Sequence, residues 1–446
     1  MLGWRILSQG EHKLDIPELS VGEKELILSV QERIKEIARV SSAETEEECR
    51  KIISDAVKYC ASQNGFYLNN TQIEYLCKIA FMHIYGFGFL EPLINDNEIE
   101  EISIVGPNKP AYVYIRKTGW KKVNATFETD AAIGELINKM ARVLGRHITM
   151  QNPRLDAILP NGSRLHASLP PISDGEITIR KFRQRPFSPK ELCSNLLTTE
   201  VMALLSMIMQ CDFSLLVAGN TASGKTTTMN ALFSFVPATE RIIITEETPE
   251  INIPHKHQLR LVANKELGIG LKDLVYDSLR MRPDRMIVGE VRNKEESEAL
   301  FDVLLAGQAR GSYATFHAQS ANEALSRLCG FGIRNDDLGS IDCIIVQRRM
   351  MEYNSKKREC KEVRKITEIA EFVGGEKQAN VFYANGKFEI EKCGLMDKIA
   401  ENFGLKRDQI LDEIKKRKTM ISDASVDHLD FFNEIQTKLY GGESSV

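Results

Sequence analysis

One segment of the sequence combines the residue types and the spacing of a phosphate-binding loop. Two glycines stand five positions apart, followed at once by a lysine and a threonine, between an apolar run and a helix-compatible segment. Glycine lets the backbone approach a phosphate closely, so that N–H groups and a helix N-terminus face the anion. We expect the lysine to contact the β- and γ-phosphates and the threonine hydroxyl to bind Mg²⁺. The predicted nucleotide-binding residues are Gly219, Asn220, Thr221, Ala222, Ser223, Gly224, Lys225, Thr226 and Thr227.

Three further segments place ionisable side chains directly after apolar, strand-like runs. Glu290 follows one run, Glu246 and Glu247 follow a second, and His317 follows a third. A carboxylate in such a place can act on a metal or on an attacking water. Each pattern taken alone also suits a solvated carboxylate or a structural histidine. Their order along the chain, behind the glycine-rich loop, favours a catalytic role.

The elements that must position these residues alternate between strand and helix patterns. Residues 191–394 show this alternation, which predicts a mainly parallel sheet covered by helices. Residues 81–182 mix strand patterns with a helix and predict a smaller α+β domain, while residues 1–80 and 395–446 show helical periodicity. Pro186 and Pro189, between charged residues, predict a linker at residues 183–190. The predicted fold class is α/β, with an α+β domain before the sheet and helical ends.

Composition and charge limit the possible partners and the compartment. The 446 residues favour two or three domains, and the formal net charge of -4 gives no general attraction to nucleic acid. Nine cysteines without a CxxC pair favour free thiols in a reducing compartment over a zinc site. The sequence shows neither a secretory signal pattern nor an apolar stretch long enough to span a bilayer. We therefore expect a cytoplasmic protein.

Taken in this order, the motifs resemble those of the type II/type IV secretion and pilus-assembly ATPase superfamily. Residues 280–292 look like its unusual Walker B element, with Gly289 and Glu290 where many phosphate-loop enzymes carry aspartate, and residues 314–318 resemble its histidine box. Upstream, residues 86–93, 99–102 and 159–164 are similar to its N-terminal domain. The N-terminal domain and the tail look closest to archaeal secretion, pilus and archaellum motors. The resemblance implies a RecA-like ATPase domain.

The resemblance also implies an assembly and its partners. It implies a homohexameric ring in which the N-terminal domain of one subunit closes over ATP and Mg²⁺ bound to the C-terminal domain. Such a ring would work on a polytopic membrane platform protein, with peripheral membrane association through that partner. Nucleic acid is not expected as a partner.

The resemblance to the superfamily implies catalytic roles for individual residues. Glu290 would polarise the attacking water and, with Thr226, bind the metal, while Glu246 and Glu247 would support the metal and water shell. His317 would report the nucleotide state toward the subunit interface. Two N-terminal arginines would neutralise charge on the γ-phosphate, although a purely stabilising role is left open for both. These arginines are Arg154 and Arg164.

The sequence departs from the family pattern in two places, and two alternatives to a secretion motor are open. Where the family commonly has Thr-Gly-His, this chain has Ala306, Gly307 and Gln308, so the role of Gln308 is open, and the four-cysteine zinc element of bacterial secretion ATPases is missing. A nucleic-acid-stimulated, helicase-like hexamer would use the same loop but needs a basic, aromatic-bearing channel. A nucleotide-binding scaffold without turnover would be expected to lack Lys225 or Glu290, and both are present.

Overall fold

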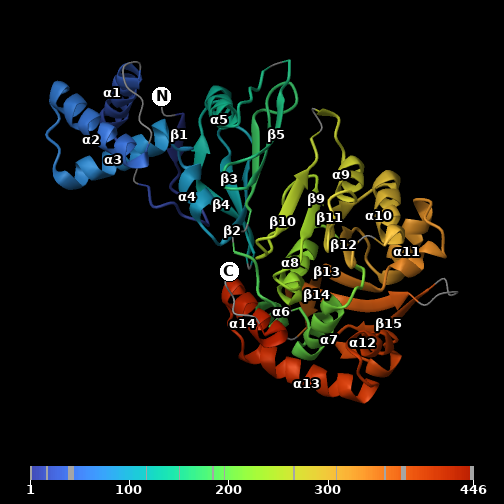
Figure 1. The fold of residues 1–446 in the computed structure, drawn as a ribbon. Helices are drawn as coiled ribbons and strands as arrows, with labels where there is room; N and C mark the ends of the chain where they lie inside the picture. Colours follow the sequence, from blue (N-terminus) through green and yellow to red (C-terminus); the bar gives the residue numbers. More distant parts are fainter. Residues whose placement is uncertain are drawn as a thin grey trace. The chain divides into compact units, whose positions relative to one another are not determined.

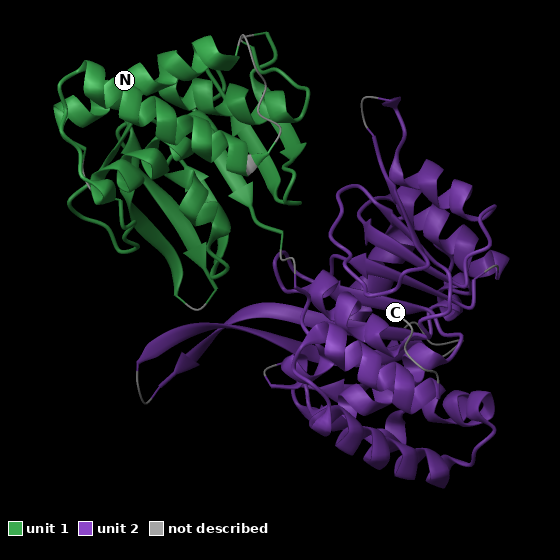
Figure 2. Ribbon diagram, turned by 60° about the vertical axis from the view of Figure 1, so that its left-hand side comes forward, with its two compact units in different colours: residues 1–183 green, residues 184–446 purple. Residues whose placement is uncertain are grey.

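The computed structural model describes most of the chain, and Figure 1 labels its helices and strands. The described residues are 3–16, 19–38, 45–116, 118–149, 151–182, 185–194, 196–264, 267–307, 309–355, 358–372 and 378–441. Gln308 therefore lies outside the described residues. The chain divides into two compact units, residues 1–183 and 184–446, which Figure 2 colours separately. Each unit is described by itself.

Unit 1 combines a group of helices with an antiparallel sheet. The sheet has the strand order β1-β4-β3-β2-β7-β6-β5. Its strands are β1 (Trp4–Ile6), β2 (Ile99–Ile104), β3 (Pro110–Ile115), β4 (Gly119–Phe127), β5 (Arg154–Ile158), β6 (Arg164–Ser168) and β7 (Glu176–Arg180). Its helices are α1 (Val21–Ala38), α2 (Glu46–Gln63), α3 (Asn70–Ile84), α4 (Leu90–Asn95) and α5 (Asp130–Val143).

The helices of the N-terminal 80 residues pack on the sheet of unit 1. Buried side chains of α1 to α3, such as Ile27 and Ile79, belong to the same hydrophobic core as Val113 of the sheet. The first strand of the described residues is β1, which pairs with β4. Its Trp4 ring packs edge-on against Phe89 at 5.8 Å. Three residues are too few for a periodic pattern, so the sequence did not predict this strand.

Unit 2 is built on one sheet of the order β10-β9-β11-β12-β8-β13-β14-β15-β16. The pairs from β10 to β13 are parallel and the remaining pairs are antiparallel. Its strands are β8 (Leu215–Gly219), β9 (Ile242–Glu246), β10 (Gln258–Val262), β11 (Arg285–Val291), β12 (Gly311–Phe316), β13 (Cys343–Asn354), β14 (Glu359–Phe372), β15 (Ala379–Ala384) and β16 (Lys387–Phe388). Its α-helices are α6 (Pro189–Cys193), α7 (Thr199–Gln210), α8 (Lys225–Leu232), α9 (Leu271–Ser278), α10 (Lys294–Ala306), α11 (Ala321–Gly330), α12 (Leu395–Phe403), α13 (Arg407–Asp423) and α14 (His428–Tyr440).

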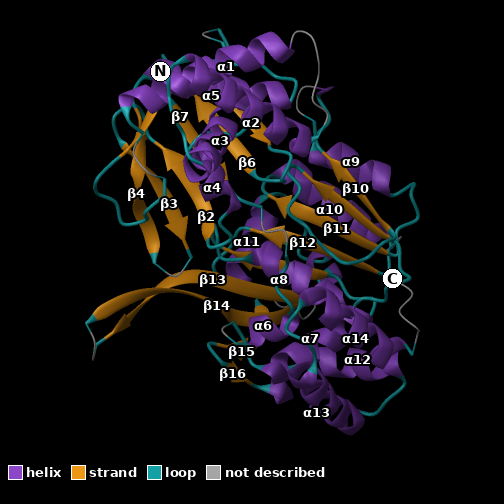
Figure 3. Ribbon diagram, turned by 90° about the vertical axis from the view of Figure 1, so that its left-hand side faces the viewer, coloured by secondary structure: helices purple, strands orange, loops and turns teal. Residues whose placement is uncertain are grey.

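Both faces of this sheet are buried, which explains its continuous apolar strands. Along β8, Leu215 and Val217 pack into the core that includes α7 and α12, whereas Leu216 and Ala218 pack on the opposite face with α10 and α11. Figure 3 shows helices on both sides of these strands. Because β8, β9, β11 and β12 are parallel and in register, their carboxyl ends meet at one edge, where ligands bind in such sheets.

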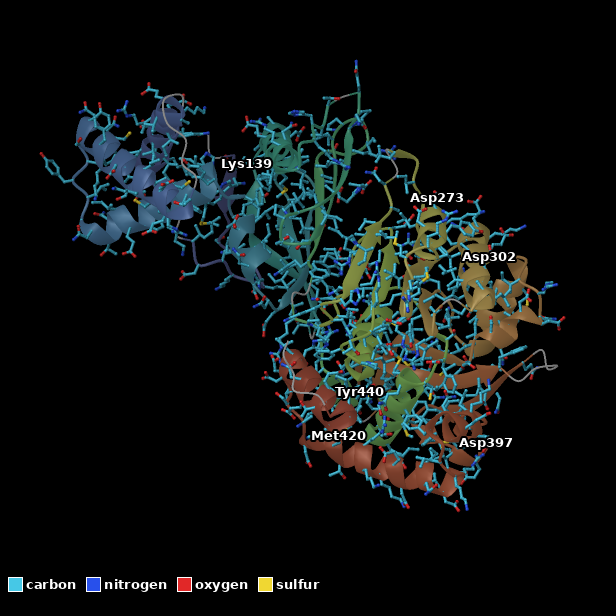
Figure 4. All side chains as sticks on the ribbon, in the orientation of Figure 1. Lys139, Asp273, Asp302, Asp397, Met420 and Tyr440 are labelled. Carbon is cyan, nitrogen blue, oxygen red and sulfur yellow. The ribbon has the colours of Figure 1, made fainter. Side chains whose placement is uncertain are left out.

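The C-terminal helices are part of unit 2. Ile414 of α13 shares a core with Met202 of α7, and the Tyr440 hydroxyl, labelled in Figure 4, donates to the Phe235 carbonyl at 2.6 Å. Helix α6 begins at Pro189, inside the segment predicted as a linker, because Ser188 caps it and proline suits the first helical turn.

Candidate functional site

The predicted phosphate loop joins the end of β8 to the start of α8. Gly224 has φ +99°, a conformation that side chains rarely adopt, and α8 begins at the next residue, Lys225. A Cβ atom on Gly219 would lie 2.1 Å from the backbone oxygen of Gln347. Both glycines are therefore required by the path of the backbone.

The interior of the loop fits a bound phosphate. The Ser223 hydroxyl is buried and has no hydrogen-bond partner among the described residues. The Lys225 side chain is only 8% exposed, and its Nζ lies 3.3 Å from the Gly219 carbonyl and 3.7 Å from Glu290 Oε1. A buried cation beside an unpaired hydroxyl at a helix N-terminus is suited to the oxygen atoms of an anion.

Thr226, the residue after the lysine, brings its hydroxyl oxygen next to a carboxylate oxygen. Thr226 Oγ1 donates to Glu250 Oε2 at 2.7 Å. Hydroxyl and carboxylate oxygens are ligands that Mg²⁺ prefers, and the ion usually takes the rest from water and phosphates. Within the described parts of the chain, no group of three or more His, Cys, Asp and Glu side chains forms a metal cluster. Glu250 lies in the acidic segment of the sequence but was not predicted as a site residue.

Glu290 is surrounded by cationic and imidazole groups. His317 Nε2 lies 2.8 Å from its Oε1, while Arg292 Nε and Nη2 lie 2.7 and 2.5 Å from its Oε2. Burial raises the pKa of Glu290, but the hydrogen bonds and charge of Arg292 and the charge of Lys225 outweigh burial, so the pKa is lowered overall. Burial and the charge of Lys225 lower the pKa of His317. Glu290 is thus held as a carboxylate close to the loop.

The other two predicted glutamates differ in their partners. Glu246 is buried, and its Oε1 accepts the backbone N–H groups of Glu250 and Ile251 at 2.7 and 2.8 Å. Its Oε2 lies 3.2 Å from Arg260 Nε, although it makes no hydrogen bond of good geometry there. Glu246 thus fixes the backbone that carries Glu250, and its expected place in the metal and water shell stays a prediction. Glu247 forms an ion pair with Arg292.

Side chains of strands β13 and β14 bind the phosphate loop, and the sequence analysis did not predict these contacts. The buried Gln347 donates to the Ser223 carbonyl at 2.7 Å and accepts from the Thr228 hydroxyl at 2.5 Å. Arg364 Nε donates to the Ala222 carbonyl at 2.8 Å. Gln347 follows an apolar run more than a hundred residues after the loop, so its only signal was a polar residue at a strand position.

Replacing Gln347 by leucine is expected to weaken both the fold and nucleotide binding. Loss of the amide leaves the buried Ser223 carbonyl and Thr228 hydroxyl without this partner, which costs about 1–3 kcal/mol per group. Urea unfolding and titration with a fluorescent ADP analogue measure the two effects. Gln319→Ala, at an exposed glutamine, is the control, and equal nucleotide affinity of the leucine variant and the control would contradict this role.

The two predicted arginines lie in unit 1, at opposite ends of one strand pair. Arg154 pairs with Ser168, whereas Arg164 pairs with Ile158. Four residues separate the two positions along the strands, which corresponds to about 13 Å. The two arginines therefore hold separate positions on the sheet, and each is a candidate in its own right.

Fold and site together define a class of protein. A parallel sheet whose strand ends present a glycine-bent loop, a buried lysine and a carboxylate is typical of phosphate-loop nucleotide-binding enzymes. The protein-family model described as "Type II/IV secretion system protein" matches residues 84–433. The chain belongs to this family.

Relatives in curated collections agree with this assignment. The chain is 36% identical over 242 residues to the uncharacterized protein MJ0781 of Methanocaldococcus jannaschii, covering 51% of this chain and 33% of that protein. It is 30% identical over 365 residues to MJ0900 of the same organism, covering 80% and 63%. The type IV secretion system protein VirB11 of Bartonella quintana is 27% identical over 348 residues, covering 66% and 95%. The chain thus spans less than two thirds of the length of the two archaeal relatives.

Proposed function

We propose that this protein hydrolyses ATP as a subunit of a homohexameric ring motor with a RecA-like catalytic domain. The observation that carries the proposal is the placement of Lys225 Nζ 3.7 Å from Glu290 Oε1 at the mouth of a glycine-bent loop. Lysine in this place neutralises the β- and γ-phosphates, and a carboxylate beside it can act on water. Family membership and the unpaired Ser223 hydroxyl support the proposal.

The chemistry assigned to the residues is an in-line displacement. The oxygen of a water molecule forms a bond to the terminal phosphorus while the bond from that phosphorus to the bridging oxygen breaks. ADP leaves with the electron pair, and Glu290 orients the water and takes its proton. Thr226 and Glu250 would hold Mg²⁺, which supplies positive charge to the phosphates.

The second part of the proposal concerns the ring. Arg154 or Arg164 of one subunit would approach the nucleotide of its neighbour, where arginine stabilises charge on the transferred phosphoryl group. The segment at residues 183–190 would be the hinge between the α+β and ATPase domains. His317, whose Nε2 lies 2.8 Å from Glu290 Oε1, would transmit the state of the site to the interface.

We further propose that the ring powers assembly of a type IV pilus-like filament or protein secretion. It would act on the cytoplasmic side, bound to a polytopic membrane platform protein. Within the described ranges, no helix is both long and apolar enough to cross a membrane.

The ring is tested by mixing inactive subunits. Lys225→Ala subunits and Arg164→Gln subunits are each expected to be inactive as pure rings. Mixed rings are expected to recover roughly a quarter of wild-type turnover, because one interface in four would join an intact lysine to an intact arginine. ATP turnover is measured together with size-exclusion light scattering, and Arg154→Gln is mixed in the same way. A monomeric active protein, or no recovery with either arginine variant, would contradict the in-trans assignment.

One observation favours the second candidate, a nucleic-acid-stimulated ATPase. Beyond Gln347 and before Glu368, strands β13 and β14 pair only with each other within the described residues, and they project as a ribbon in Figure 3. Residues 348–365 contain eight Lys and Arg against three Glu, and Tyr353 is 63% exposed. Basic residues with an exposed aromatic ring suit single-stranded nucleic acid. Stimulation of ATP turnover by single-stranded DNA or RNA would favour this candidate.

A further inference from the structure

Both oxygen atoms of Glu290 lie near nitrogen atoms in this structure, and Oε2 accepts two hydrogen bonds. Oε1 lies 2.8 Å from His317 Nε2 and 3.7 Å from Lys225 Nζ. Two nitrogen atoms of Arg292 donate to Oε2 at 2.7 and 2.5 Å. An oxygen with two donors has no remaining lone pair for a water molecule. The carboxylate therefore cannot accept a proton from water at Oε2 until Arg292 moves.

Arg292 has an alternative partner within reach. Its Nη1 already forms an ion pair with Glu247, which lies just past the end of β9. A guanidinium can bind one carboxylate with two N–H groups, so Arg292 could leave Glu290 without losing all of its ionic partners. The Arg292 side chain is 44% exposed, whereas that of Lys225 is 8% exposed. Half-exposed ion pairs break readily because water screens them.

We propose that Arg292 is a positioning residue that restrains Glu290, and that hydrolysis requires Arg292 to release the Oε2 atom of this carboxylate. This inference rests on the proposed function, in which Glu290 acts on the attacking water. Movement of Arg292 toward Glu247 would free Oε2 for the attacking water.

The size of the effect follows from the weakness of an exposed ion pair. An ion pair of this kind is formed for about half to five sixths of the time. Without Arg292, Oε2 is therefore free roughly two to six times more often than in the wild type. The kcat of Arg292→Gln is therefore expected to rise two- to sixfold above that of the wild type. KM for ATP is expected to stay constant, because Arg292 acts through Glu290. The kcat of Arg292→Lys is expected to lie between the values of the wild type and Arg292→Gln, because lysine keeps the charge but not the two-nitrogen contact of Arg292.

The test is a double-mutant cycle on the full-length chain. Steady-state ATP turnover is compared for the wild type, Arg292→Gln, Glu290→Gln and the double variant, with Arg334→Gln as the control at an exposed Arg–Asp pair outside the site. The gain from Arg292→Gln is expected to disappear in the Glu290→Gln background, which a general effect on the fold would not do. Glu247→Gln removes the alternative partner and is expected to lower kcat.

Other outcomes overturn the inference. An unchanged or reduced kcat of folded Arg292→Gln, or the same gain in the Glu290→Gln background, would show that Arg292 does not restrain Glu290. If Arg292→Gln fails to fold, as seen by circular dichroism, an unchanged or raised kcat of Glu247→Gln would decide against the restraint. A wild-type chain without ATP turnover would overturn the proposed function as well, whereas turnover that is insensitive to Arg292 would overturn this inference alone.

Discussion

Replacement of Lys225 by alanine is expected to abolish ATP turnover, with a fall in kcat of at least about 10³-fold. The Lys225 ammonium is the buried cation of the phosphate loop, and no other lysine in the described loop can replace it. Its loss leaves the charge on the β- and γ-phosphates uncompensated where water is largely excluded, so nucleotide affinity should fall as well. Turnover assays and titration with a fluorescent ATP analogue measure both effects.

The matched control for this variant is Lys294→Ala. The Lys294 side chain is 65% exposed and pairs only with Glu298 in the described structure. Removing this surface ion pair should change stability by less than about 1 kcal/mol and leave turnover intact. Appreciable turnover by Lys225→Ala, in a protein that is folded by circular dichroism, would mean that nucleotide is hydrolysed somewhere else.

Replacement of Glu290 by glutamine is expected to lower kcat by about 10²–10⁴-fold while ATP still binds. The amide keeps the size of the side chain but cannot take a proton from water. The pKa of Glu290 is lowered, chiefly because Arg292 and Lys225 outweigh burial, so the carboxylate is ionised at neutral pH and its loss should be felt there. Single-turnover kinetics with saturating ATP separate this loss of chemistry from a loss of binding.

Glu298→Gln provides the control, because its carboxylate lies on α10 in a half-exposed pair with Lys294. Retention of more than a tenth of wild-type kcat by Glu290→Gln would remove Glu290 from the chemical step. Glu250, which contacts Thr226, would then be the next carboxylate to test.

The site could be predicted from the sequence only where function depends on neighbouring positions. The loop residues form one continuous segment, from Gly219 to Thr226. They are consecutive because a loop that encloses a phosphate must be built from neighbouring backbone groups. This pattern supported the resemblance to the secretion and pilus ATPases, which the family match confirms. The catalytic roles of Glu246, Glu247, Glu290, His317, Arg154 and Arg164 stay predictions.

The partners of the loop could not be predicted, because they come from distant segments. Gln347 and Arg364 reach the loop only because β13 lies beside β8 and β14 beside β13. Such polar residues have no local signal that separates them from ordinary strand residues. The pairing of Arg292 with both Glu247 and Glu290 likewise depends on the order in which β9 and β11 lie in the sheet.

By itself, the sequence determined the family and the α/β class and predicted the phosphate loop, because apolar periodicity and consecutive loop residues are properties of short segments. Only the tertiary structure decided that the first helices share one core with the α+β sheet and that the C-terminal helices pack on α7. Likewise, only the tertiary structure decided that Arg292 binds the carboxylate of Glu290. These features depend on contacts between residues far apart in the chain, whose free energy depends on packing and burial that no local pattern records.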